Sequence, residues 1–370
     1  MREFLRTRGL PNSALLNFSP DRAMASATDL SDPTTTNTRA PSASRLLDVR
    51  GLSLSFATAE GELPITKNVS FSIKPGERVG IVGESGCGKT VTGLSLLRLL
   101  PPQSARVKGE ILFEGTDLAG LSARQMRAVR GRDIAMIFQE PMSALDPVFT
   151  VGDQISEAYR AHFPASRAEG RQRAIAALAE VGIPAPERRC DEYPHQLSGG
   201  MRQRVMIAMA LICKPKLLIA DEPTTALDVT VQAQITDLLR SLSERTGTAL
   251  IFITHDLGVV AEVCTRMITM YAGEVVEDAP VDDALLRPRH PYTSGLLRSL
   301  PGLSQRRGVL PSIPGRVPSP SGMPVGCRFR PRCSHAVPGC EREQPMIEVD
   351  AGRLARCWRA PDLTLPGAVN

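Results

Sequence analysis

The sequence predicts an α/β fold in which a mostly parallel sheet is covered by helices. Short apolar runs that indicate buried strands alternate with stretches of helical periodicity, and this alternation is typical of parallel sheets. A glycine-rich loop at residues 83–90 joins one of these strands to a helix. After Gly273 the composition changes, because Pro and Arg become frequent. We therefore expect an α/β core followed by a C-terminal extension.

The first strands are predicted from alternating apolar and polar residues. Leu46–Phe56 and Val69–Ile73 both alternate in this way, and Gly61 and the pair Pro75-Gly76 are turn signals beside them. An antiparallel sheet is therefore expected ahead of the glycine-rich loop. Further short strands are expected at Arg78–Val82, Ile111–Phe113, Ile134–Phe138, Leu217–Ala220, Ala249–Ile253 and Met267–Met270.

Helices are predicted at two places in particular. One follows the glycine-rich loop at Val91–Leu100, where Pro101 and Pro102 would end it. The other is an insert with helical periodicity at Val151–Leu211, placed between strands of one sheet.

The chain divides into three parts by composition. Residues 1–44 are rich in Ser, Thr, Pro and Ala, and we expect a disordered extension there. Residues 45–272 form the expected α/β domain, with a helical subdomain at about 140–215. Residues 273–370 form a C-terminal region, in which Pro311–Pro324 is expected to be an extended linker.

Composition restricts the class of protein. The chain has 370 residues, 42% of them hydrophobic, so it can bury a sizeable core, and its net charge is only +5. No apolar run approaches the ~20 residues that span a bilayer, so a function at a membrane would need another chain to do the spanning. Aromatic residues make up 4%, which argues against a base-stacking surface for nucleic acid. No apolar segment follows the N-terminal arginines, so a reducing compartment without disulfides is expected for the eight cysteines.

The glycine-rich loop is the strongest functional signal. It fits G-x-x-x-x-G-K-[ST] between an apolar strand and a helix, the context in which backbone N–H groups and a helix N-terminus bind phosphate. A lysine here can reach the β- and γ-phosphates of a nucleotide, and the hydroxyl after it can bind Mg²⁺. The alternative is a glycine-rich turn with a solvated lysine. The loop residues are Gly83, Glu84, Ser85, Gly86, Cys87, Gly88, Lys89 and Thr90.

Polar residues follow three of the predicted buried strands. Asp221 and Glu222 end an apolar run, and ligands bind at the ends of parallel strands. Asp221 can hold Mg²⁺ through its water shell, and Glu222 is placed to deprotonate an attacking water. Gln139 and His255 follow two other strands and suit sensors of a γ-phosphate. The alternative for Asp221 and Glu222 is a pair of exposed carboxylates at a turn, and for Gln139 and His255 it is an ordinary loop or core residue.

A second anion site is predicted in the helical insert. Ser198 can cap the helix that begins there, and Gly199 and Gly200 expose backbone N–H groups. This site would lie on a different subdomain from Lys89. A capped helix start without a ligand is the alternative.

Together these motifs resemble those of the ATP-binding subunit of an ABC transporter. Residues 83–90 are similar to Walker A, Leu197–Arg204 to the signature motif and Leu217–Glu222 to Walker B. The resemblance covers about Leu46–Tyr271 and implies a RecA-like P-loop NTPase core with an antiparallel β subdomain and a helical signature subdomain. It implies Mg²⁺ ligands at Thr90, Gln139 and Asp221. It also implies a Q-loop glutamine at Gln139, a D-loop aspartate at Asp228, a switch histidine at His255 and an adenine-stacking aromatic at Phe56.

The resemblance also implies a mechanism and partners. Two ATPase domains pair head to tail, so ATP on the Walker A of one is closed by the signature motif of the other. Closure and hydrolysis then drive a membrane permease between inward- and outward-facing states. The chain is accordingly expected at the cytoplasmic face of the membrane, with no nucleic-acid partner.

A narrower resemblance is to the oligopeptide/dipeptide branch, which includes nickel importers. It rests on Gln139–Pro147, Asp228–Gln234, His290–Thr293 and a C-terminal group of cysteines. Such subunits usually pair with a distinct ATPase chain and depend on an extracytoplasmic substrate-binding protein. Peptides, glutathione and nickel remain open as substrates. An exporter cassette or a soluble ABC protein acting on nucleic acid or ribosomes is less favoured, because of the cysteine-rich tail and the single Walker A.

The C-terminal cysteines are spaced C-x5-C-x6-C-x16-C at Cys327, Cys333, Cys340 and Cys357. This spacing lacks the paired knuckles of zinc ribbons and differs from the common ferredoxin run. Four free thiols are one interpretation, and one metal centre that staples a tail without a large core of its own is the other. The resemblance implies a [4Fe–4S] cluster, with zinc, in which His335 could replace a thiolate, as the alternative. Four arginines close in sequence could offset its negative charge: Arg328, Arg330, Arg332 and Arg356.

Overall fold

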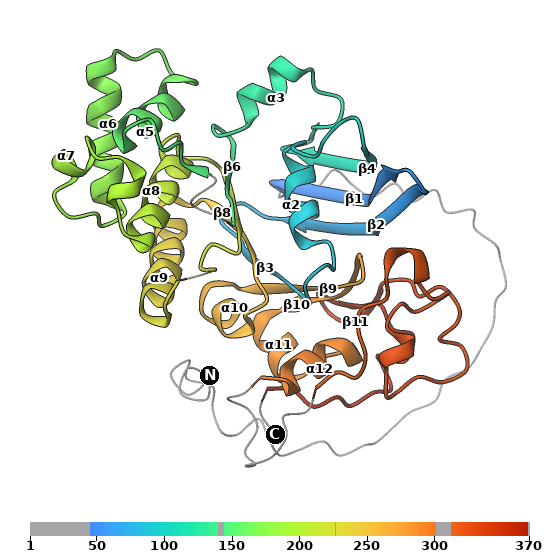
Figure 1. The fold of residues 1–370 in the computed structure, drawn as a ribbon. Helices are drawn as coiled ribbons and strands as arrows, with labels where there is room; N and C mark the ends of the chain where they lie inside the picture. The colour runs from blue at the N-terminus through green and yellow to red at the C-terminus, as the bar shows by residue number, and fades with distance from the viewer. Residues whose placement is uncertain (1–44, 140–143, 226, 301–311, 369–370) are drawn as a thin grey trace. The chain divides into compact units, whose positions relative to one another are not determined.

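The computed structural model describes residues 45–139, 144–225, 227–300 and 312–368, and these residues form one compact unit (Figure 1). The expected N-terminal extension lies outside the described residues. So do Glu140–Ser143 of the peptide-branch stretch and Pro311 of the expected linker.

An antiparallel sheet precedes the glycine-rich loop, as predicted. It consists of β1 (Leu47–Thr58), β2 (Gly61–Ile73), β4 (Ala105–Phe113) and β5 (Thr116–Asp117) in the order β2-β1-β4-β5. Strand β4 begins six residues before the expected Ile111, because its first half is exposed and polar and gives no apolar signal. The apolar faces of these strands join the main core.

The central sheet of the described residues has a parallel half. It contains β3 (Arg78–Val82), β6 (Ile134–Ile137), β7 (Leu217–Asp221), β8 (Ala249–Ile253) and β9 (Arg266–Tyr271), in the order β9-β3-β8-β7-β6. Every residue of β7 and β8 is buried, as expected for strands covered on both faces. The α/β prediction is therefore confirmed. Strand β6 ends one residue earlier than predicted, and Phe138 is exposed.

Three antiparallel strands extend this sheet beyond β9, and the sequence did not predict them. They are β10 (Glu274–Pro280), β12 (Arg353–Ala355) and β11 (Ile347–Asp350), in the order β9-β10-β12-β11. Strand β10 carries buried carboxylates at Glu277 and Asp278, so its sequence gives no apolar run. The hydrogen-bonded sheet thus continues across Gly273, and the domain division predicted there stays a prediction.

Helices cover the sheet and form a separate group on one side of it. Figure 1 shows α5 (Val151–Arg160), α6 (Arg167–Glu180), α7 (Pro186–Arg189) and α8 (Gly199–Leu211) gathered away from β1 and β2. Their bounds agree with the helical insert expected at Val151–Leu211. The other helices are α2 (Lys89–Leu96), α3 (Ala123–Val129), α9 (Val229–Thr246), α10 (Leu257–Val263), α11 (Val281–Leu286) and α12 (Pro291–Arg298). Within the described residues, short 3₁₀ turns lie at Pro194–Gln196, Pro320–Gly322 and Arg330–Arg332.

Helix α2 differs from its prediction at both ends. It begins at Lys89 and ends at Leu96, well before the prolines that were expected to end it. The chain leaves the helix through Arg98, whose φ is 50°. Arg130 supplies a cap from outside, since its Nε donates to Leu97 O at 2.8 Å and its Nη2 to Arg98 O at 2.8 Å. A tertiary contact of this kind leaves no local sequence signal.

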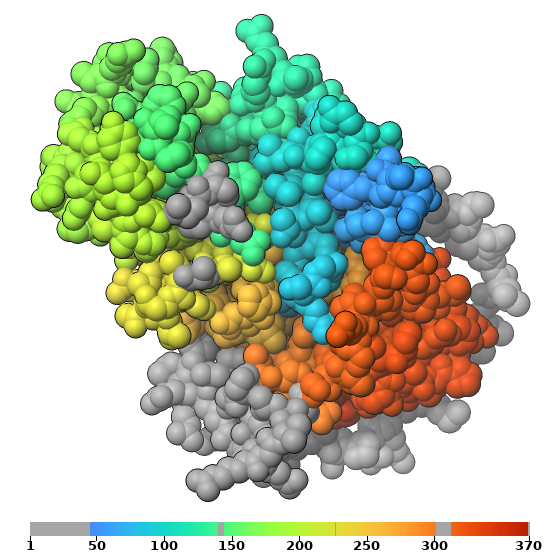
Figure 2. Space-filling model, viewed as in Figure 1, coloured from blue at the N-terminus to red at the C-terminus, as the bar shows by residue number. Residues whose placement is uncertain are grey.

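The C-terminal region and the end of the central sheet share a second hydrophobic cluster. Tyr271, Tyr292 and Phe329 pack as buried rings, with centroids 4.6 to 5.3 Å apart. Ile313 and Val317, from the expected linker, pack against the same cluster, so the described part of that segment is not a free linker. The region therefore packs on a cluster that it shares with β9 and β10, and its need for a metal staple stays a prediction. In Figure 2 the orange and red surface of this region borders the blue and cyan N-terminal segments.

The helices of the described residues include none that is both long enough and apolar enough to cross a membrane.

Candidate active site

The glycine-rich loop lies between β3 and the start of α2. Lys89 is buried, and its Nζ donates to Gly83 O at 2.8 Å and Glu84 O at 3.1 Å, so the ammonium lies at the centre of the loop. Gly88 has a φ of 97°, and a Cβ there would lie 2.8 Å from Thr66 Cγ2 on β2. Glycine is needed at this position both for the backbone angle and for the close approach of β2.

The turn between β9 and β10 holds this loop from outside, and the sequence analysis missed it. Gly273 N donates to Cys87 O at 3.0 Å, and Lys67 N donates to Gly273 O at 2.9 Å. A Cβ at Gly273 would lie 2.0 Å from Ile65 O. Both Ala272 and Gly273 have positive φ, as in a two-residue hairpin turn, but Ala-Gly is not one of the usual sequence pairs of such turns.

The first carboxylate of the β7 end lies next to the loop. Asp221 is buried, and Thr90 Oγ1 donates to its Oδ1 at 3.2 Å. Burial raises the pKa of Asp221, and the Thr90 hydrogen bond and the Lys89 charge act in the opposite direction. A hydroxyl and a carboxylate oxygen side by side are a donor set that fits Mg²⁺.

The second carboxylate, Glu222, lies where the ends of three strands bring polar groups together. Glu222 Oε2 accepts from Gln139 Nε2 at 3.2 Å, and His255 Nδ1 lies 3.4 Å from Glu222 Oε1. The Glu222 backbone has a φ of 44°. The Glu222 N–H donates to Ile253 O at 2.9 Å, which fixes Glu222 against β8. The structure thus brings together Gln139, Glu222 and His255, which lie 83 and 33 residues apart in sequence.

Thr225 is a further member of this group that the sequence analysis missed. Its Oγ1 donates to Glu222 Oε2 at 2.9 Å, and its N–H donates to Glu222 O at 3.1 Å across a turn. A threonine three residues after the carboxylate, beyond Pro223, is a turn pattern that could have suggested the contact.

The predicted second anion site lies at the start of α8. Ser198 caps the helix by accepting from Met201 N at 3.3 Å, and Ser198 and Gly199 are exposed. Gly200 lies against α9, since a Cβ there would lie 2.8 Å from Val231 Cγ1. Asp228 caps α9 by accepting from Val231 N at 2.9 Å. Among the described residues, no hydrogen bond joins these groups to the glycine-rich loop of the same chain.

Phe56 is half-buried near the end of β1, where it pairs with Leu63 on β2 and Ala105 on β4. Its predicted contact with adenine stays a prediction.

The four C-terminal cysteines line one cavity of about 20 Å³, together with His335. All eight cysteines of the chain are free, and burial raises the pKa of Cys327 to about 11. No group of three or more His, Cys, Asp or Glu in the described residues is arranged to hold a metal ion. Three of the arginines expected to offset a metal centre bind elsewhere: Arg328 to Ala272 O, Arg332 to Glu84, and Arg356 to backbone carbonyls.

Two families match this chain in separate segments. Residues 66–225 match the family described as ABC transporter, and residues 276–340 match the family described as oligopeptide/dipeptide transporter, C-terminal region.

Relatives match over most of the chain. A protein of Sinorhizobium fredii named "Probable peptide ABC transporter ATP-binding protein" is 55% identical over 326 residues, which cover 87% of this chain and 97% of that protein. A protein of Brucella abortus whose name describes peptide import and ATP binding is 50% identical over 312 residues, which cover 84% of this chain and 94% of the relative.

Solved structures match the ATPase part. The ATP-binding cassette MJ0796, a dimer in a post-hydrolysis state bound to ADP and Pi, has a TM-score of 0.57 at 30% identity and covers 64% of this chain and 98% of its own. The cbiO1 protein of Clostridium perfringens has a TM-score of 0.55 at 29% identity, covering 65% and 90%. The 55% identity to the Sinorhizobium relative extends over 87% of this chain. It shows that this protein belongs to the ABC transporter family, as one of its ATP-binding ATPases.

Proposed function

We propose that this chain is the subunit whose ATP hydrolysis powers a peptide importer. The observation that carries the ATPase assignment is the group around Glu222, where Gln139, Thr225 and His255 meet the carboxylate beside the Thr90–Asp221 pair. The match of residues 276–340 to the oligopeptide/dipeptide C-terminal region supports the peptide substrate, as do the names of the relatives.

Each residue of the site has a proposed role. Lys89 and the backbone N–H groups of residues 83–90 bind the β- and γ-phosphates. Thr90 and Asp221 would hold Mg²⁺, with Gln139 as a further ligand, and the ion would offset phosphate charge. Glu222 takes the proton of the attacking water, because its Oε2 is oriented by two donors. His255 contacts the other oxygen of that carboxylate and is placed to donate to the γ-phosphate.

Pairing with a second ATPase chain is part of the proposal. Ser198 and Gly199 are exposed at a helix start that also includes the half-buried Gly200, and in the described residues this start has no hydrogen bond to the loop of the same chain. We infer that they close the nucleotide on a partner's Walker A, with Asp228 at the same interface. MJ0796, which is similar to this chain over its ATPase part, is described as a dimer. A distinct second chain, rather than a copy of this one, is the form expected for the peptide branch.

An apolar groove next to Gln139 is the proposed docking site of a permease helix. The groove has a volume of about 580 Å³ and is lined by residues of β6, α8 and the segment that follows α2, including Leu99, Phe138, Met206 and Met209. Phe138 directly precedes Gln139, so a helix seated there would act on the residue that contacts Glu222. A Phe138→Glu variant that still co-purified with the permease would contradict this docking. The chain would thereby lie peripherally at the cytoplasmic face of the membrane, sedimenting with membranes only when the permease is present.

We also propose a metal centre at the four C-terminal cysteines. This proposal rests on the family resemblance and on the cavity that the four cysteines share. The thiols as arranged do not fit a metal ion, and a centre would require them to move together. Anaerobic purification with metal analysis separates the cases. Brown protein with about four iron per chain supports the [4Fe–4S] cluster. Colourless protein with one zinc would replace it with a zinc site, and protein without metal would leave four plain thiols.

The substrate proposal is tested by finding which permease and binding-protein genes lie beside this one and assembling their products with this chain. The assembled transporter, in lipid vesicles, should hydrolyse ATP several-fold faster when its binding protein carries a peptide. Nickel and glutathione are the other arms of the experiment, and stimulation by one of them alone would reassign the substrate. An extracytoplasmic binding protein acts here only through the permease. Hydrolysis that depended on nucleic acid instead of membrane partners would contradict the transport function.

A further inference from the structure

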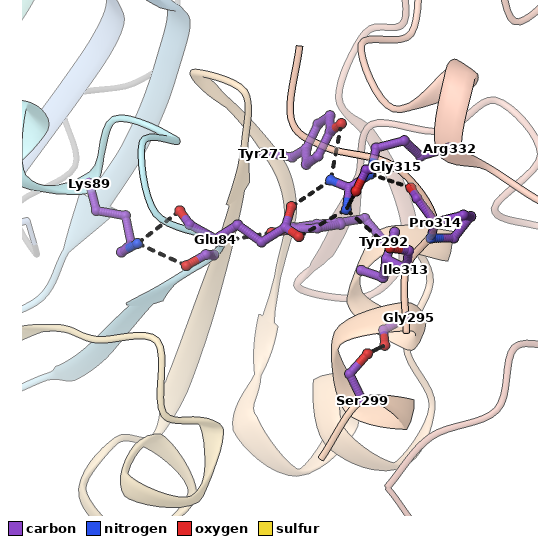
Figure 3. Close-up of polar contacts among 11 residues, drawn as sticks. Glu84, Lys89, Tyr271, Tyr292, Gly295, Ser299, Ile313, Pro314, Gly315 and Arg332 are labelled. Atoms are coloured by element: carbon purple, nitrogen blue, oxygen red, sulfur yellow. Dashed lines mark hydrogen bonds and ion pairs between the residues drawn. The ribbon is translucent and has the colours of Figure 1, made fainter. Parts of the chain in front are cut away.

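The C-terminal region reaches the phosphate-binding loop through one buried arginine. Arg332 is separated from Glu84 by 248 residues, yet its Nη1 lies 2.6 Å from Glu84 Oε2 and its Nη2 lies 2.9 Å from Glu84 Oε1 (Figure 3). The Arg332 side chain is only 5% exposed, and that of Glu84 is 30% exposed. Two parallel N–H···O bonds between a guanidinium and a carboxylate are among the strongest and most directional pairs in proteins.

A second residue of the C-terminal region binds the backbone of the same loop residue. Glu84 N donates to Tyr292 Oη at 2.8 Å, and Tyr292 is fully buried on α12. The carbonyl of Glu84 accepts from Lys89 Nζ. Figure 3 shows the consequence, since Glu84 lies between Lys89 on one side and Arg332 and Tyr292 on the other. The position of the lysine that would meet the phosphates is therefore linked by hydrogen bonds to the C-terminal region.

The arginine itself is held on several sides. Its Nε donates to Pro314 O at 2.8 Å, and its guanidinium lies over the Tyr271 ring with 5.7 Å to the centroid. Longer contacts reach Ile313 O at 3.5 Å and Gly315 O at 3.4 Å. Arg332 ends a 3₁₀ turn and is followed at once by Cys333, which packs against the same aromatic cluster. A guanidinium fixed in this way can hold Glu84 in one rotamer without rearrangement.

We propose that Arg332 and Tyr292 are positioning residues of the ATP site, through which the four-cysteine region sets the conformation of the phosphate loop. This inference rests on the proposed ATP site at residues 83–90. Neither side chain contacts the groups around Glu222 that carry out hydrolysis. Their loss should therefore weaken ATP binding more than it slows the chemical step. A purely structural role would lower thermal stability and leave ATP binding as it was.

The test uses the full chain with Arg332→Gln, Glu84→Gln and the double variant. Arg342→Gln is the matched control, because Arg342 is an exposed arginine of the same region. We measure the Kd of a fluorescent ATP analogue, together with KM and kcat for ATP. Each single variant should raise Kd and KM roughly tenfold, the scale of a lost charge-assisted hydrogen bond, with kcat within about twofold. The double variant should be no worse than either single, because both remove the same pair.

Two results would overturn the proposal. One is an Arg332→Gln chain that melts at a lower temperature but keeps the wild-type Kd and KM. The other is a double variant whose loss is the product of the two single losses, which would show independent effects. If Arg332→Gln does not fold, Tyr292→Phe removes only the hydroxyl, and an unchanged KM there would equally count against the coupling. Lys89→Ala is measured alongside, and unchanged ATP affinity in that variant would point instead to a failure of the ATP site.

Discussion

Glu222, the proposed general base, shows how neighbouring groups fix the position of one side chain. Its backbone is in the left-handed region, with a φ of 44°, and the turn that results aims both carboxylate oxygens at donors. Gln139 and Thr225 both donate to Oε2. A carboxylate whose oxygen has two donors has less freedom to rotate, so the proposed base is held in one geometry.

A prediction at this scale concerns the threonine. Thr225→Val removes the hydroxyl that donates to Glu222 Oε2 and should lower kcat about three- to tenfold, the range of one modest hydrogen bond, with little change in ATP affinity. Steady-state ATPase assays on the full chain measure both values. Thr225→Ser keeps the hydroxyl and should restore kcat. A Val variant with wild-type kcat would show that the contact has no part in catalysis.

The sequence predicts residues whose role is local and fails where a contact is long-range. Lys89, Asp221 and Glu222 follow from motifs, because the loop and the strand end are each continuous in sequence. Arg332 does not, since its contact with Glu84 spans 248 residues and its neighbours in sequence suggested a metal centre instead.

At the scale of elements, burial on both faces explains which strands were predictable. Strands β7 and β8 are buried throughout and apolar, so the sequence shows them plainly. Strand β10 is also buried, but Glu277 accepts from Arg289 N at 2.7 Å and His290 N at 2.9 Å. A buried carboxylate that accepts hydrogen bonds from another segment of the chain cannot be told from a surface carboxylate in the sequence.

The junction of β10 and α12 predicts a dependence of stability on pH. His290 is buried and caps α12, since its Nδ1 accepts from Tyr292 N at 3.1 Å. Burial, with a smaller effect from Arg356, lowers the pKa of His290 from 6.5 to about 3. Between these values the unfolded chain binds a proton that the folded chain does not. The contribution of His290 to the free energy of unfolding is therefore fully present above pH 6.5. As the pH falls below that value, this contribution decreases by up to ~1.4 kcal/mol per pH unit.

His290→Asn, which keeps an acceptor at the helix cap, should remove this part of the slope. Denaturant unfolding of both chains between pH 7 and 4 gives the difference. Burial also raises the pKa of Glu277 to about 7, which produces the opposite slope, but that residue is present in both chains. Parallel curves for the two chains over this range would contradict the prediction.

At the scale of the whole molecule, the site is divided between two surfaces. The phosphate loop follows the C-terminal end of β3, and Glu222 follows the C-terminal end of β7. Ser198 lies instead at the start of α8, in the helical group. The hydrogen bonds of the described residues do not connect them within one chain. The head-to-tail pairing of two ATPase chains that we propose accounts for this separation.

Pairing is tested with a Ser198→Arg chain mixed with its wild-type partner. The bulky cation should impair hydrolysis at the site built on the partner's phosphate loop, and the site built on Lys89 should stay active. Trapping of labelled nucleotide on each chain distinguishes the two sites. Loss confined to the Lys89 site would contradict the head-to-tail arrangement.

The most direct measurement of the central claim, hydrolysis of ATP at the Glu222 site, compares wild-type chain with Glu222→Gln. The amide keeps the shape and contacts of the side chain but cannot accept the proton of the attacking water. The variant should bind ATP as tightly as wild type and hydrolyse it at least ~10²-fold more slowly, the usual scale for a positioned base. Turnover within a few-fold of wild type in the variant would contradict the assignment of this carboxylate and, with it, the account of the site.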